Sequence, residues 1–89
     1  MTIDKAQRTL QEIKKTAMNA SLTGSLKGGA GVLVKAYNAI FKHAVSQQWI
    51  ENNGIVTEID IAELDDSPRH QMDYIGCAAG LLSALIEER

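Results

Sequence analysis

The chain has 89 residues, a formal net charge of -2 at pH 7, 45% hydrophobic residues and only 4% aromatic ones. This length suits one domain, and the composition is too apolar for a disordered chain. No apolar stretch approaches the roughly 20 residues that span a bilayer. We therefore expect no membrane partner. Cys77 is the only cysteine, so we expect no intrachain disulfide and a cytoplasmic protein.

The first expected element is a helix over about residues 3–19. Lys5, Arg8 and Lys15 make this helix basic, and they would contact phosphates if the domain bound nucleic acid. The apolar residues are spaced alternately three and four apart, which places them on one narrow seam of the kind found in helical bundles. They are Ile3, Ala6, Leu10, Ile13, Ala17 and Ala20.

Charge is distributed unevenly along the chain. Residues 1–43 have seven basic and two acidic side chains, whereas residues 44–89 have two basic and nine acidic ones. A basic half can indicate a surface for nucleic acid. An acidic half in the same small domain would repel phosphates unless it faced away. We therefore favour a basic helix and an acidic helix of one bundle that lie side by side, and keep a nucleic-acid partner as an alternative.

Residues 24–31 contain four of the seven glycines and predict a break between the first two helices. Glycine-rich backbone that leads into a helix N-terminus, with a lysine nearby, can bind an anion, and Lys27, Gly28 and Gly29 would do so here. The segment lacks the spacing of a phosphate-binding loop and follows no predicted strand. We therefore favour a plain connection or a close helix contact over an anion or small-molecule site.

The sequence Ser25-Leu26-Lys27-Gly28-Gly29-Ala30 resembles the segment that follows the phospho-accepting histidine in histidine-phosphotransfer domains, which are helical bundles. Gly24 stands where the histidine would be. The resemblance covers this short segment alone, and without the imidazole it implies no phosphotransfer role for this chain.

A second helix is expected over about residues 27–50, with a broad apolar face and an end before the Asn-Gly turn signal at 53–54. Trp49, near its end, would either close the bundle or anchor a partner, and we favour closure. Residues 55–64 alternate in hydropathy like a half-buried strand, but a lone strand would have no partner within the chain. They predict either a short helix capped by Thr57 or an isolated strand that pairs with another copy.

The last helix is expected over about residues 67–88, beginning at Ser67 and Pro68. Its apolar residues cover most of the circumference, which is typical of a buried helix, and two other helices are too few to cover it. We therefore expect an all-α three-helix bundle that is completed by self-association. Small residues recur every four positions and would let another backbone approach closely. The expected interface consists of Gly76, Gly80, Leu81, Ala84, Leu85 and Trp49.

No set of side chains predicts catalysis or metal binding. His70 and Cys77 are separated by about 10 Å along a helix, which is too far for one metal ion. No base is placed by the sequence to activate Cys77 as a nucleophile. We therefore expect no cofactor and a non-enzymatic protein-interaction or adaptor protein that acts as a homo-oligomer. The alternatives are a nucleic-acid-binding regulator and a small-molecule or anion-binding protein.

Overall fold

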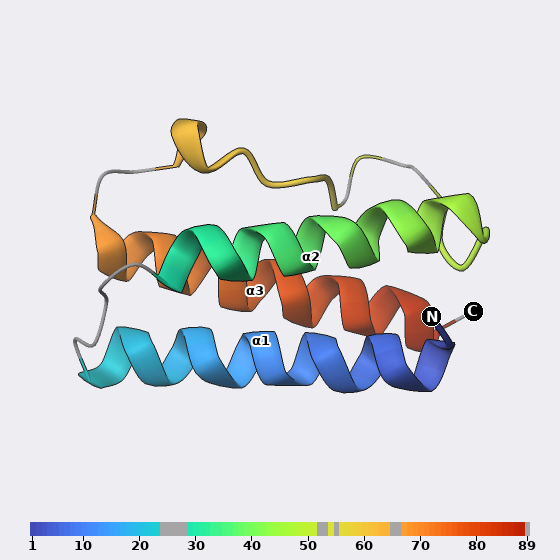
Figure 1. Cartoon of the computed structure of the whole chain (residues 1–89), viewed down its shortest axis with the longest axis horizontal. Coiled ribbons are helices and arrows are strands. Elements are labelled where there is room, and N and C mark those ends of the chain that lie inside the picture. The colour runs from blue at the N-terminus through green and yellow to red at the C-terminus, as the bar shows by residue number, and fades with distance from the viewer. Residues whose placement is uncertain (24–28, 52–53, 55, 65–66, 89) are drawn as a thin grey trace.

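The computed structural model describes residues 1–23, 29–51, 54, 56–64 and 67–88. These residues form three α-helices, α1 (Ile3–Thr23), α2 (Gly29–Ser46) and α3 (Pro68–Glu87), and a 3₁₀ turn, η1 (Ile61–Glu63), with no strand in this part of the chain. α1 runs antiparallel to both α2 and α3, and the two termini lie at the same end of the molecule (Figure 1). The prediction of an all-α three-helix bundle is confirmed.

α1 begins at a threonine cap. The backbone N–H of Lys5 donates to Thr2 Oγ1 over 3.2 Å, which satisfies one of the free N–H groups of the first turn. The helix continues to Thr23, one turn beyond the predicted end at 19. That extra turn still contacts α3, because Ser21 Oγ donates to the Asp73 carboxylate over 2.6 Å.

α2 ends at Ser46, one turn before the predicted end at 50. Gln48 adopts the left-handed conformation, with a φ of 59°. The N–H of Trp49 donates to the Ala44 carbonyl (2.9 Å) and the N–H of Gln48 to the Val45 carbonyl (3.1 Å), which together form a Schellman motif. The prediction was wrong here because this motif usually has Gly or Asn in the left-handed position.

The chain between α2 and α3 runs back along the bundle, because α3 begins at the end opposite to where α2 stops (Figure 1). We call residues 56–64 the return segment. Val56 and Ile59 are buried in the core. The carboxamide of Asn38 replaces a neighbouring strand: its Nδ2 donates to the Ile59 carbonyl (2.9 Å), and its Oδ1 accepts from the Ile59 N–H (2.8 Å). The Tyr37 hydroxyl also donates to the Thr57 carbonyl (3.0 Å).

These bonds decide between the two predictions for residues 55–64. The two-residue alternation expected of a strand is wrong here: Val56 and Ile59, three apart, are the buried residues, while Thr57 and Ile61 are exposed. The backbone of the segment is paired by side chains of α2. A strand partner from another copy is not needed. The helical part is limited to η1, which begins after Asp60, whose carboxylate accepts from the Ala62 N–H (3.0 Å). Thr57 is therefore not the cap.

The core lies where the inner sides of the three helices meet the return segment. α1 and α3 make the most extensive helix contact. At their interface Ser83 is buried, and its Oγ donates to Gln7 Oε1 (2.6 Å) and accepts from Gln11 Nε2 (3.0 Å), while Gln7 Nε2 donates to the Ser83 carbonyl (3.0 Å). A satisfied polar network of this kind favours one register of two packed helices. The buried apolar side chains are Ala6, Leu10, Ile13, Ala17, Val34, Tyr37, Ile40, Phe41, Ala44, Val56, Ile59, Met72, Ile75, Ala79, Leu82 and Ile86.

Replacement of Asn38 tests the attachment of the return segment. Asn38→Ala leaves the N–H and the carbonyl of Ile59 without the partners that they have here, so we expect the free energy of unfolding to fall by about 1–2 kcal/mol. Urea unfolding measures this loss, and the amide of Ile59 should exchange faster with solvent. Lys35→Ala, on the exposed side of the same helix, is the control. An equal effect of both substitutions would show that Asn38 does not hold the segment.

Candidate interaction surface

The side of α3 that faces away from the bundle is uncharged over three turns. Tyr74 is 51% exposed and Leu81 is 50% exposed, and Cys77 and Ala84 are exposed between and beside them. No exposed position from 74 to 84 has a charged side chain. The solvent-facing side of a helix normally has polar and charged residues, so this side is unusual. We call these four residues the outer α3 surface.

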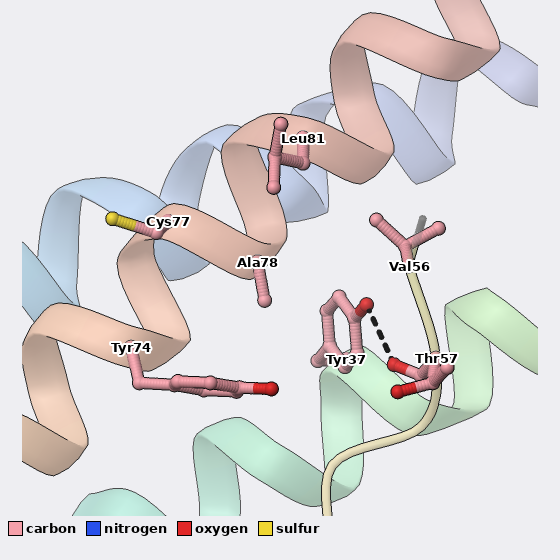
Figure 2. Close-up of a pocket in the computed structure, with 7 residues that line it drawn as sticks. All are labelled: Tyr37, Val56, Thr57, Tyr74, Cys77, Ala78 and Leu81. Atoms are coloured by element: carbon pink, nitrogen blue, oxygen red, sulfur yellow. Dashed lines mark hydrogen bonds between the residues drawn. The ribbon is translucent and has the colours of Figure 1, made fainter. Parts of the chain in front are cut away.

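Two hollows flank this surface, and Cys77 and Leu81 line both of them. The first lies between α3, α2 and the return segment and has a volume of about 130 Å³. Figure 2 shows Tyr37 and Tyr74 in this hollow, with the Cys77 side chain pointing away from Tyr37. The second lies between α3 and α1. Its other lining residues are Lys14, Met18, Asp73, Gly76 and Gly80.

The neighbour of the two glycines is α1 of the same chain. A Cβ atom placed on Gly76 would lie 3.4 Å from Met18 Cγ, and one placed on Gly80 would lie 3.7 Å from Lys14 Cδ. The sequence left open whether this neighbour came from the same chain or from a partner. Gly76 is buried, whereas Leu81 and Ala84 stay exposed. The predicted interface residues therefore divide between an intrachain contact and a free surface.

Leu85 and Trp49 are half-buried and pack against the core. The Trp49 ring meets the His43 ring edge-on, with 5.1 Å between the ring centroids. His43 is in the last turn of α2 and Trp49 follows the end of that helix, so Trp49 packs over the end of α2, as expected if it closes the bundle.

The three basic residues considered for nucleic acid, Lys5, Arg8 and Lys15, are all exposed on α1. Their spacing places them along one side of the helix together with Glu12, which lines the same shallow depression as Lys5 and Arg8. An acidic side chain therefore interrupts the basic line.

A contact between basic and acidic elements occurs at the return segment. Lys42 Nζ of α2 lies 3.6 Å from Glu58 Oε1, and both side chains are largely exposed. Such exposed ion pairs contribute about 0–1 kcal/mol to stability. The pair joins the basic half of the chain to the acidic half, but its acidic member lies on the return segment and not on a helix.

Of the residues considered for anion binding, Lys27 and Gly28 lie outside the described residues. Gly29 is the first residue of α2, and a Cβ atom placed on it would lie 3.5 Å from Met72 Cε of α3. Among the described residues, no three His, Cys, Asp or Glu side chains come together as metal ligands would. None of the described helices combines the length and apolarity needed to cross a membrane.

Burial raises the pKa of Tyr37 to about 12, and the nearby Tyr74 hydroxyl contributes a smaller part of the shift. The Tyr37 side chain is fully buried, and its hydroxyl donates a hydrogen bond to the return segment. Ionisation would remove that donor and place a negative charge beside the core. We therefore expect the attachment of the return segment to α2 to weaken at alkaline pH, where Tyr37 ionises.

The free energy of unfolding, measured as a function of pH above about 9, tests this coupling. The folded pKa lies above the ordinary value of about 10, so this stabilisation is complete below pH 10 and is lost as the pH rises towards 12. We expect the free energy of unfolding to fall over that range by on the order of 2 kcal/mol. Tyr37→Phe should remove this part of the pH dependence. A wild-type profile that matches that of the variant would contradict the coupling.

The spacing at Gly80 allows a second measurement. Because a methyl group there would meet Lys14 at an ordinary contact distance, Gly80→Ala should stabilise α3 by about 0.5–1 kcal/mol through helix propensity. Urea unfolding in dilute solution measures the gain. Ala84→Gly, one turn further along, should give a loss of similar size. A destabilised Gly80→Ala variant would mean that α1 and α3 are packed more closely than this structure shows.

Comparisons of the chain with protein-family models, curated proteins and solved structures found no significant match. The short resemblance of residues 25–30 to phosphotransfer domains is thus not extended by a family match.

Proposed function

We propose that this chain is a non-enzymatic protein-interaction or adaptor domain that acts as a homo-oligomer through the outer α3 surface. The observation that supports it is the half-exposure of Tyr74 and Leu81 on a helix side that has no charged residue between positions 74 and 84. Apolar side chains on neighbouring turns gain free energy when a partner removes them from water.

The arrangement of these side chains matters more than their number. Single exposed apolar residues are common on folded proteins, and Val32 of α2, which is 70% exposed, is one here. Tyr74, Cys77 and Leu81 instead lie on successive turns and border two hollows. Tyrosine also suits an interface because its ring is apolar while its hydroxyl can bond to a partner or to water. The outer α3 surface therefore favours a partner over solvent.

We also place the protein in the cytoplasm. Cys77 is the chain's only cysteine, and its thiol is exposed on the proposed interface. A reducing compartment would keep such a thiol free, whereas an oxidising one would favour cross-linked chains.

Solution mass tests the proposal directly. Light scattering after size exclusion should give wild-type protein a mass above that of the monomer, increasing with concentration. Leu81→Glu places a charge in the middle of the surface and should give a monomer, because burial of an unpaired carboxylate is costly. Val32→Glu changes an equally apolar, exposed position on α2 and should behave as wild type. A wild-type monomer at the highest attainable concentration would refute self-association.

A further inference from the structure

The hollow between α2, α3 and the return segment has the size of a single ring. Its volume is about 130 Å³. For comparison, an engineered apolar cavity of about 150 Å³ holds one benzene molecule. The lining residues come from three separate elements and include Tyr37, Val56, Thr57, Tyr74, Ala78 and Leu81. The hollow is therefore formed within one chain, and it does not require the self-association proposed above.

The inner walls of the hollow are apolar. Tyr37 and Val56 are buried, and Figure 2 shows the Ala78 methyl group pointing into the space between the rings of Tyr37 and Tyr74. None of the described residues that line the hollow has a charged side chain. A charged ligand would lose hydration here without gaining an ion partner, which is strongly unfavourable. The hollow therefore suits an uncharged ring that packs against aromatic side chains.

The hydrogen bonds of Thr57 leave an acceptor at the hollow. The Thr57 carbonyl already accepts from the Tyr37 hydroxyl (3.0 Å). The Thr57 hydroxyl donates its own hydrogen to the Glu58 carbonyl (3.1 Å), so its oxygen can only accept a further bond. Figure 2 shows the Tyr74 hydroxyl pointing toward Tyr37 and Thr57. A ring that has a hydroxyl or N–H donor would complement the Thr57 oxygen.

We propose that this hollow is a binding site for a small, uncharged ligand that has one aromatic ring and one hydroxyl or N–H donor. The donor bonds to the hydroxyl oxygen of Thr57. The ring lies beside Ala78 and covers part of Tyr74, which is 51% exposed. The inference goes beyond the proposed function, because it adds a small-molecule site to an interaction domain.

Phenol is the probe that has these features, and benzoate is its charged counterpart. NMR titration of ¹⁵N-labelled protein with phenol should give saturable shifts that are largest at Thr57 and Ala78. So few heavy atoms should bind with a Kd of about 1–10 mM. Benzoate should bind at least about tenfold more weakly, because no cation lines the described walls of the hollow. Equal affinities, or phenol shifts that do not saturate and spread over the whole surface, would overturn the proposal.

A larger side chain at Ala78 tests the location of the site. Ala78→Leu fills the hollow and should abolish the saturable shifts with phenol. Ala39→Leu adds the same side chain at an exposed position of α2 that does not line the hollow, and it should bind phenol as wild type does. Phenol binding that is retained by Ala78→Leu would show that the ligand lies elsewhere.

Thr57→Val tests the hydrogen bond and does not depend on the folding of Ala78→Leu. It replaces the hydroxyl by a methyl group of similar size and should raise the Kd of phenol about three- to tenfold. Thr9→Val is the control, because the Thr9 hydroxyl also donates to a backbone carbonyl, that of Lys5 (2.9 Å), but lies on α1. It should leave the Kd unchanged. An unchanged Kd in Thr57→Val would refute the assigned acceptor.

Discussion

The antiparallel contact between α1 and α3 is the constraint on which the rest of the structure depends. Ser83 is buried in this contact and satisfied by Gln7 and Gln11, while Gly76 and Gly80 accommodate side chains of α1. Because α2 is also antiparallel to α1, α3 must begin at the far end of the bundle from the end of α2 (Figure 1). The chain therefore has to cross the whole length of the molecule between these two helices.

The segment that crosses has no strand partner, so its backbone N–H and C=O groups need other hydrogen-bond partners. Two neighbouring residues of α2 solve it: Asn38 bonds to both backbone groups of Ile59, and Tyr37 bonds to Thr57. The return segment thus covers one side of the α2–α3 contact but leaves Tyr74 and Leu81 half-exposed. A hollow remains between this segment, α2 and α3, and Tyr74 and Leu81 line it.

Several features of the fold were predictable because they depend on local spacing. The seam of α1 and the Ser67-Pro68 start of α3 are examples, since periodicity and helix-start signals need no knowledge of the neighbours. The end of α2 was not predictable, because Gln48 adopts a conformation that usually marks Gly or Asn. The partner of residues 55–64 was missed for a different reason: no rule of strand pairing points to a side-chain carboxamide on a helix.

The sequence by itself determined three helices, the apolar excess of the last one and the uneven charge, because these are sums and periodicities along the chain. Only the tertiary structure decided which of the apolar residues of this helix are buried and which are exposed. It buried Gly76 against α1 and left Leu81 and Ala84 in solvent, although all three belonged to one predicted interface. Spacing along a helix establishes which residues share a side, whereas the packing of the other elements decides which sides are covered.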